Sequence, residues 1–259
     1  MPTPFYHLAL AHAALAHPDL SEAARAHLTA HLGPFLLGNT APDVQTVSGQ
    51  PREATHFFDL PTAAPIPAWE PLFAAYPHLA DAAALDPAHA AFLAGYLAHL
   101  LLDQLWIIHI LVPYFYNDPT WPSRDDRRLW HNVLRAYLDA QCLPTLIGPT
   151  GAHLASATPH HWLPFTADEH LTTWRDFIAN QLQPGQPSQT VAVLAERIGA
   201  DPARFAAALA DQAALQANLF GRYPLATHAQ YRQHALTLTL RTLNAYLAGN
   251  LPAAHLRIE

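Results

Sequence analysis

The feature that most constrains this chain is a long apolar run between Asp86 and Pro113. Asp86 is followed by proline, a pair typical of a helix start, and Pro113 predicts the end of the helix because proline cannot continue one. The residues between them are apolar on nearly every side, which is the pattern of a helix buried all round. We therefore expect this helix at the centre of the fold.

Three ionisable residues interrupt the apolar run: His99, Asp103 and His109. His99 and Asp103 are four residues apart, so both project from one helix face. His109 follows Asp103 by six residues, which turns it aside by roughly a third of a circle at 3.6 residues per turn. All three side chains can therefore face one cavity. Gly95, one turn before His99 on the same face, leaves room for another segment to approach.

Buried imidazole and carboxylate groups need partners, because an unpaired charge inside a protein costs several kcal/mol. One explanation is a His–Asp hydrogen bond that holds the core together, and for a single pair this would be the better explanation. Further histidine and aspartate residues in loops and helices could converge on the same place. Their number favours a bound metal.

The composition indicates a protein with a substantial core. The chain has 259 residues, of which 51% are hydrophobic and only 13% charged, and all its basic residues are arginines. A formal net charge of −7 argues against binding to a nucleic acid polymer or to an anionic membrane surface. Cys142 is the single cysteine, which excludes an internal disulfide and a cysteine-based zinc cage.

The N-terminal residues lack a basic start followed by an apolar run, so we expect no signal peptide and a cytoplasmic protein. The central run is long enough to span a membrane. Its ionisable residues favour a soluble core helix instead, and we expect no transmembrane segment. The oligomeric state is left open by the sequence.

The rest of the chain is typical of Ala- and Leu-rich helices, with no strand pattern and no internal repeat. We expect helices at about residues 5–17, 19–33, 68–85, 124–141, 167–182, 189–198, 201–220 and 227–248. Thr3, Ser123 and Asp201 can cap three of them, and Thr166 to Glu169 has the pattern of a capping box. Residues 144–164 are predicted to form a loop between helices of one kind, so we expect a single all-α domain, residues 1–259.

A long irregular stretch covers residues 38–67. Structureless loops of such length are usually functional or disordered, and this one has too many apolar and aromatic residues for disorder. Its candidate ligands are Asp43 and His56. Taken alone, Asp43 would be better explained as a turn or cap residue, as aspartate after proline often is.

The candidate metal ligands are seven in number: His7, Asp43, His56, His99, Asp103, His109 and His131. All offer nitrogen or oxygen, a set that suits zinc (Zn²⁺) and can also suit manganese or iron. One zinc ion takes about four ligands, so this set favours a cluster of two or three ions. A metal pair roughly 3.5–4 Å apart is the usual device for phosphate ester hydrolysis.

The order of these motifs resembles that of a known family. An early histidine, His7, is followed by G-x-x-A-P-D ending at Asp43, by T-H-F around His56, and by G-x-x-x-H-x-x-x-D from Gly95 to Asp103 with a histidine six residues later. This order resembles the zinc-dependent phospholipase C family, an all-α superfamily that also contains the S1/P1-type nucleases. The resemblance covers roughly the first half of the chain.

The resemblance implies a metal-dependent phosphoesterase that acts on a small phosphate ester or a phospholipid. It also implies three zinc ions with shared ligands. The first would be held by Asp43, His56, His99 and Asp103, the second by His7 and the bridging Asp103, and the third by His109 and His131. Asp43 would act as the general base or orient the attacking water.

At one position the chain differs from the family pattern. The family has glutamate four residues after the histidine that corresponds to His131, and this chain has Arg135 there. A guanidinium has no lone pair to offer a cation. We therefore expect two occupied zinc ions, with Arg135 binding a substrate phosphate bidentately. In the alternative, Arg135 lies at the surface and pairs with Asp139 or Asp125.

Two further functions stay open at this point. The first is a nuclease or nucleotidase on the same scaffold, for which the negative net charge disfavours a polynucleotide substrate but not a mononucleotide. The second is a non-catalytic, zinc-stabilised binding protein, which the replacement of a carboxylate by Arg135 would suit.

Overall fold

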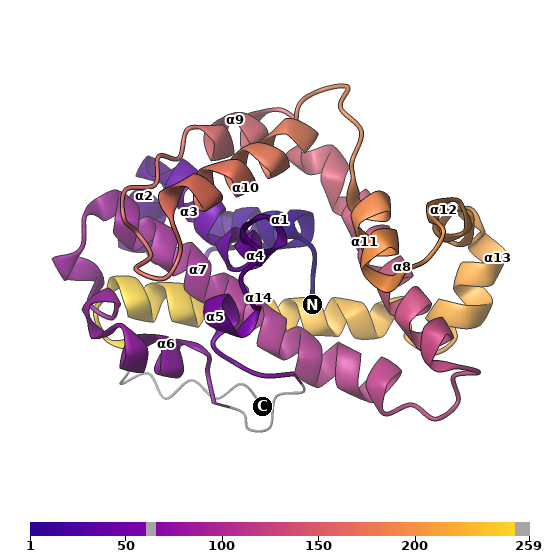
Figure 1. The fold of residues 1–259 in the computed structure, drawn as a ribbon. Coiled ribbons are helices and arrows are strands. Elements are labelled where there is room, and N and C mark those ends of the chain that lie inside the picture. Colours follow the sequence, from indigo (N-terminus) through magenta and orange to yellow (C-terminus); the bar gives the residue numbers. More distant parts are fainter. Residues whose placement is uncertain (61–65, 252–259) are drawn as a thin grey trace.

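A computed structural model describes residues 1–60 and 66–251, and all their regular elements are helices, which confirms the all-α prediction (Figure 1). Before the central helix the chain forms α1 (Pro4–Ala16), α2 (Glu22–Ala30), α3 (Leu32–Gly38), η1 (Ala41–Val44), α4 (Gln45–Ser48), α5 (Glu53–His56), α6 (Trp69–Ala75), η2 (Pro77–Leu79) and η3 (Ala82–Ala84). The central helix is α7 (Pro87–Trp106), continued by η4 (Ile107–Tyr116). After it come α8 (Arg124–Leu146), α9 (Pro149–Ala155), α10 (Asp168–Gln181), α11 (Thr190–Ile198), α12 (Pro202–Ala210), α13 (Gln212–Ala214), η5 (Leu215–Phe220) and α14 (Leu225–Leu247).

Helix α7 begins where the sequence predicts. The side chain of Asp86 accepts a hydrogen bond from the backbone N–H of Ala88 at 2.9 Å, and Pro87 occupies the first turn. Every residue from Ala90 to Trp106 is buried. The span Pro87–Tyr116 is long and apolar enough to cross a membrane, but 94% of its apolar window is buried inside the protein. Neighbouring helices therefore cover the surface that a lipid would otherwise contact.

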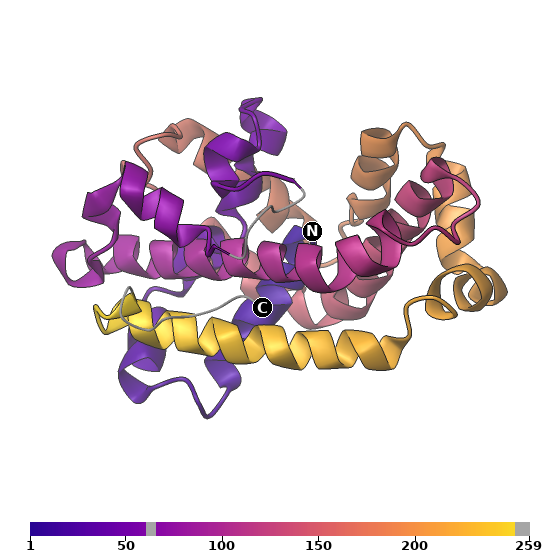
Figure 2. The same cartoon turned by 90° about the horizontal axis from the view of Figure 1, so that it is seen from below.

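Helices α3 and α14 are the main packing partners of α7. Helix α14 lies beside α7 and runs in the opposite direction (Figure 2). Helix α3 approaches still more closely because glycines stand at the contact. A Cβ atom on Gly38 would collide with the carbonyl group of Phe92, and one on Gly95 would collide with the carbonyl oxygen of Phe35. The close approach of a second segment at Gly95 was predicted from the sequence and is confirmed.

The central helix does not end at Pro113 as predicted. It continues as the π-helix η4 to Tyr116, with Pro113 inside it. The backbone N–H of Asn117 bonds to the carbonyl of Val112 at 2.8 Å, a spacing of five residues. A proline clashes with the carbonyl four residues earlier in an α-helix, and the wider π turn relieves that clash.

Other predicted boundaries also differ from the structure, two of them at prolines. The second helix ends at Ala30, and Gly33 and Pro34 lie in the first turn of the next helix, α3. Helix α8 continues through Pro144, so much of the predicted 144–164 loop is helical in α8 and α9. The predicted 38–67 loop contains the short helices η1, α4 and α5, and its residues 61–65 lie outside the described part. The predicted 201–220 helix is interrupted at Asp211.

Of the four predicted caps other than Asp86, two are confirmed and two are wrong. Ser123 and Asp201 accept hydrogen bonds from the first turns of α8 and α12. Thr3 makes no capping bond, because its hydroxyl instead donates to the carboxylate of Asp139. Thr166 does not cap α10, since its hydroxyl donates to Gln50 at 3.2 Å. In both cases a tertiary partner replaces the local one.

One prediction concerns His228, which fastens α14 to the core. Its ring nitrogens lie 3.0 Å from the hydroxyl of Tyr6 and 3.1 Å from that of Tyr223, and burial lowers the pKa of His228 to about 4. In the unfolded chain this histidine becomes protonated near pH 6.5, whereas in the folded chain it becomes protonated only near pH 4. Stability contributed by the neutral imidazole is therefore lost as the pH falls from 6.5 towards 4.

The measurement is the free energy of unfolding at pH 7 and pH 5. The wild type should lose about 2 kcal/mol more over this interval than His228→Gln, which keeps hydrogen-bonding groups but does not titrate. His78→Gln is the matched control, because His78 is exposed. Equal losses in wild type and His228→Gln would contradict the assignment.

Candidate metal centre

Five of the seven candidate ligands lie in one cluster, which is centred on the carboxylate of Asp103. Nε2 of His7 lies 3.4 Å from Oδ1, whereas Nε2 of His56 and Nε2 of His99 lie 3.3 and 3.8 Å from Oδ2. Nε2 of His56 is also 3.8 Å from the Asp43 carboxylate. The donor atoms form two overlapping groups, each within 4.8 Å: His7, His99 and Asp103, and Asp43, His56 and His99.

The position of His99 follows from the contact between α3 and α7. Nδ1 of His99 donates a hydrogen bond to the backbone carbonyl of Asn39 at 2.8 Å. Because a carbonyl can only accept, the proton of the neutral ring lies on Nδ1 and the lone pair on Nε2 faces Asp103. The His7 ring from α1 stacks on the His99 ring, with centroids 3.8 Å apart and planes 5° apart.

His56 is presented by the short helix α5. Its Nδ1 lies 3.0 Å from the Thr55 hydroxyl and 3.3 Å from the carbonyl oxygen of Arg52. The hydroxyl of Tyr96 on α7 donates to the carbonyl of Thr55 and ties α5 to the central helix. These contacts leave Nε2 of His56 as the ring atom directed at Asp103.

Asp43 lies in the 3₁₀ turn η1, with Pro42 beside it. Its backbone N–H donates to the carbonyl of Thr40 at 3.1 Å, and the same carbonyl accepts a 2.8 Å bond from the indole N–H of Trp174 on α10. The side chain of Asp43 is 14% exposed, whereas that of Asp103 is 1% exposed. Asp43 is therefore the carboxylate of the cluster that a molecule from solvent can reach.

The protonation states within the cluster suit a cation. Burial alone would raise the pKa of Asp103, but the imidazoles of His99, His56 and His7 outweigh it and hold that pKa well below its usual range. The pKa of Asp43 is also lowered, since His99 and His56 outweigh its burial. Burial and the stacked His99 lower the pKa of His7 to about 4. Ionised carboxylates and neutral imidazoles are the forms that bind metal ions.

Several buried atoms of the cluster have no hydrogen-bond partner among the described residues: Nδ1 and Nε2 of His7, Nε2 of His56, Nε2 of His99 and Oδ1 of Asp103. A buried polar atom without a partner costs about 1–3 kcal/mol of stability. Five such atoms in one place would therefore take up a large part of the free energy of unfolding of a typical domain. A cation with nitrogen and oxygen ligands would satisfy them together. The donor set therefore fits zinc.

Arg52 is a member of the cluster that the sequence analysis did not identify. Its Nη2 donates to Oδ2 of Asp103 at 2.9 Å, and its guanidinium stacks on the ring of Phe58 at 4.6 Å. Arg52 precedes His56 by four residues, so the helical spacing could have placed both side chains on one face.

The other two candidate ligands, His109 and His131, lie apart from the five. The His109 ring packs edge-on against His234 of α14, with centroids 5.4 Å apart. Nε2 of His131 accepts a hydrogen bond from the indole of Trp106 at 3.0 Å. In the described part of the chain neither belongs to a group of three or more close donors. A third zinc ion at these residues stays a prediction.

Arg135 is buried, with 7% of its surface exposed, so the alternative of a surface residue paired with Asp139 or Asp125 is wrong. Its Nη1 donates to Oδ1 of Asn132 at 2.6 Å, and its Nε has no partner among the described residues. The Asp139 carboxylate is already bonded to the hydroxyls of Thr3 and Thr190.

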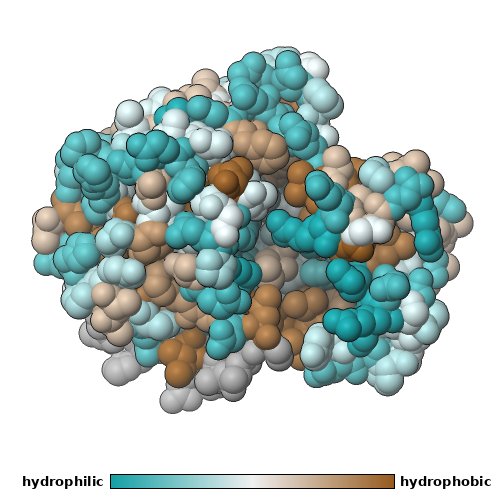
Figure 3. All heavy atoms as spheres, in the orientation of Figure 1, coloured by the Kyte–Doolittle hydropathy of each residue, from teal (hydrophilic) through white to brown (hydrophobic). Residues whose placement is uncertain are grey.

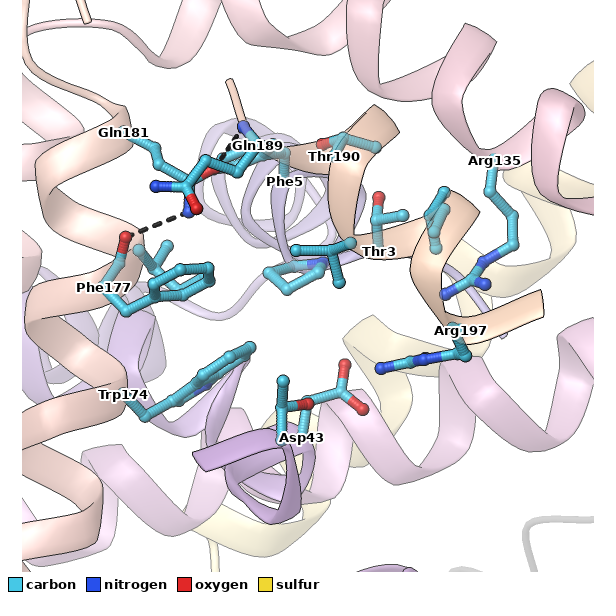
Figure 4. A pocket seen from close by; sticks show the side chains of 15 residues that line it. Thr3, Phe5, Asp43, Arg135, Trp174, Phe177, Gln181, Gln189, Thr190 and Arg197 are labelled. Atoms are coloured by element: carbon cyan, nitrogen blue, oxygen red, sulfur yellow. Dashed lines mark hydrogen bonds between the residues drawn. The ribbon is translucent and has the colours of Figure 1, made fainter. Parts of the chain in front are cut away.

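An apolar pocket opens beside Asp43. Trp174 and Phe177 of α10 lie on one side of it, and Arg135 and Arg197 lie on the opposite side (Figure 4). The guanidinium of Arg197 extends towards the Asp43 carboxylate (Figure 4). This pocket, named here the Asp43 pocket, offers an apolar wall and positive charge next to the metal centre. It can therefore accept an apolar group joined to an anion.

Comparison with known proteins agrees with this geometry. Residues 6–182 match the zinc dependent phospholipase C family, and this segment contains every candidate site residue from His7 to Arg135. The match covers well over half of the 259 residues, so the chain belongs to this family. Membership implies a zinc-dependent phospholipase C hydrolase. No curated protein and no solved structure matches the chain.

A prediction follows from the tight contact at Gly95. A Cβ there would meet the carbonyl oxygen of Phe35 and, at 2.8 and 2.9 Å, the backbone and side-chain nitrogens of Asn39. Gly95→Ala must displace α3 and with it the carbonyl that orients His99. We expect a destabilisation of about 1–3 kcal/mol and a lower zinc content. Unchanged thermal melting and zinc content would contradict this account of the contact.

A second prediction separates the two sets of candidate ligands. His99 belongs to both donor groups, so His99→Ala should remove at least one zinc ion per chain, as measured by elemental analysis. His109→Ala is the matched control and should leave the zinc content unchanged, because His109 lies outside both groups. The opposite pattern would place the metal centre elsewhere.

Proposed function

We propose that this protein is a phospholipase C-like phosphoesterase that uses two zinc ions held around Asp103. The observation that carries the proposal is the set of buried imidazole and carboxylate atoms around that residue that have no hydrogen-bond partner in residues 1–60 and 66–251. A zinc pair would supply hydroxide at neutral pH and stabilise the charge on a phosphoryl group. The donor groups suggest Asp43, His56 and His99 for one ion and His7 with Asp103 for the other, because the single free lone pair of His99 can serve only one ion.

In this proposal Asp43 activates or orients the attacking water, and Arg135 binds the phosphate. Asp43 is ionised and reachable from solvent, so it can accept a proton from the attacking water or hold that water in line. The buried guanidinium of Arg135 lines the same pocket as Asp43 and can donate two parallel hydrogen bonds to a phosphate. The apolar wall with Trp174 and Phe177 would receive the apolar part of the ester.

The substrate in this proposal is a phospholipid or a smaller phosphate ester. The test is a screen with zinc-loaded protein against phosphatidylcholine in mixed micelles, bis(p-nitrophenyl) phosphate and p-nitrophenyl phosphate. Turnover should disappear on zinc removal with a chelator and return when zinc is restored. A protein that binds zinc tightly but hydrolyses none of these, nor a mononucleotide, would be the non-catalytic binding protein instead.

Arg135 provides the sharpest prediction. Arg135→Gln should lower kcat/KM by about 10- to 100-fold, the value of one lost charged hydrogen-bond pair, without changing zinc content. Arg135→Glu should instead raise the zinc content, because it restores a carboxylate ligand beside His131. Arg241→Gln is the control, since this exposed arginine lies on α14 away from the pocket. If both Arg135 variants behaved like the control, Arg135 would have no part in the site.

A further inference from the structure

A second cleft adjoins the Asp43 pocket and concentrates positive charge. It has a volume of about 350 Å³, and its lining includes Arg124, Arg127, Arg128, Arg135 and Arg197 together with His131. We call it the arginine cleft. These are five of the 13 basic residues of a chain whose net charge is −7. No aspartate or glutamate lines the cleft in the described part of the chain.

The five arginines lack carboxylate partners. Within the described residues none of them has a carboxylate oxygen within 4.0 Å, although Arg52, Arg175 and Arg222 elsewhere form such pairs. Arg127 is held by a 2.7 Å bond from its Nη1 to the carbonyl of Tyr116. Asp125 and Asp126 are near in sequence, but they line a neighbouring hollow on the other side of Arg128. The positive charge of the cleft is therefore not cancelled within it.

Arg135 connects the cleft to the metal centre. It lines both the arginine cleft and the Asp43 pocket, as does Arg197. Burial and the neighbouring Arg197 lower the pKa of Arg135 to about 10, so the group stays charged at neutral pH while it is repelled by its neighbour. Its buried Nε has no partner among the described residues. Gathering like charges around a buried guanidinium whose Nε has no partner among the described residues lowers the stability of the fold, and a bound anion would restore it.

The surface of the molecule agrees with this arrangement. The face shown in Figure 3 is hollowed near its middle, and hydrophilic residues lie along the side of the hollow near α11. Arg197 belongs to α11, whereas Arg124, Arg128 and Arg135 belong to α8, so two helices contribute the charge. Because Arg135 lines both spaces, a ligand with one phosphate bound at Arg135 beside the metal centre could extend its other groups into this cleft.

We propose that the arginine cleft binds a second phosphate group of the substrate, so that the protein prefers phosphate esters whose headgroup carries a further phosphate. The proposal rests on the proposed phosphoesterase function and names its substrate class. The guanidiniums of Arg124, Arg128 and Arg197, which have no carboxylate partner among the described residues, match a dianionic phosphate better than the cationic choline group of phosphatidylcholine. Such a headgroup could come from a lipid or from a soluble ester.

The first experiment measures binding to zinc-loaded protein by calorimetry at fixed ionic strength. The probes are inositol 1-phosphate and inositol 1,4-bisphosphate, which differ by one phosphate. The bisphosphate should bind at least about 10-fold more tightly, the effect of one charge-assisted contact. In the double variant Arg124→Gln, Arg128→Gln this preference should fall to about 3-fold or less. Equal affinities of the wild type for both probes would overturn the proposal.

The control is the double variant Arg232→Gln, Arg241→Gln, which removes the same charge from exposed positions on α14. It should keep the preference for the bisphosphate. If the control variant lost as much of the bisphosphate preference as the cleft variant, the preference would depend on the net charge of the protein and the proposal would be wrong. A single-stranded oligonucleotide that competed better than the bisphosphate would overturn it in favour of a polynucleotide ligand.

The second experiment distinguishes the sources of the headgroup and separates this proposal from the proposed function. Hydrolysis is compared for phosphatidylinositol and its 4-phosphate in mixed micelles, and for the deacylated forms of both. A preference for the 4-phosphate in micelles alone supports a lipid, and one in both settings supports a soluble ester. Tight bisphosphate binding without any hydrolysis would support phosphate binding in the arginine cleft and contradict the proposed phosphoesterase function. Hydrolysis without a preference for the 4-phosphate would support the phosphoesterase function and contradict phosphate binding in the cleft.

Discussion

The carboxylate of Asp103, placed in the middle of a fully buried helix, is the group on which the rest of this structure depends. A carboxylate in that position is tolerable only if cationic or hydrogen-bonding groups surround it. The chain meets this condition with imidazoles from α1, α5 and α7 and with the guanidinium of Arg52. Segments far apart in the sequence are thereby drawn to one point on α7.

The second constraint is the close approach of α3 to α7. Gly38 and Gly95 remove the side chains that would separate the two helices. Because α3 lies so close, the carbonyl of Asn39 reaches His99, and the following turn η1 brings Asp43 to the cluster. Trp174 of α10 holds that turn from the outside through Thr40. The glycines thus act on the metal centre through the positions of Asn39 and Asp43.

The sequence predicted the elements that depend on local rules. The start of α7, its burial, the opening at Gly95 and the shared face of His99 and Asp103 follow from capping and helical period. The family match over residues 6–182 extends further than the predicted first half, and it supports the same class of protein. All five donors of the cluster were among the seven candidate ligands predicted from the sequence, which also included His109 and His131.

The prediction that the central helix ends at Pro113 failed, because η4 continues the helix as a π-helix from Ile107 to Tyr116. The expected direction of His109 rested on roughly 3.6 residues per turn, and in the structure its ring packs against His234. Its role as a zinc ligand stays a prediction. Arg52 could have been found from its spacing to His56. Arg197 could not, because its place beside Arg135 depends on how α11 packs against α8, which no local pattern specifies.

The most direct test of the central claim is a diffraction measurement at the zinc absorption edge on crystals of the zinc-loaded protein. The account predicts anomalous peaks within bonding distance of the Asp103 carboxylate and of Nε2 of His99, with His7, His56 and Asp43 as further ligands. Zinc–nitrogen and zinc–oxygen distances should be about 2.0–2.2 Å. Peaks found only at His109 or His131, or no peak beside Asp103, would contradict it.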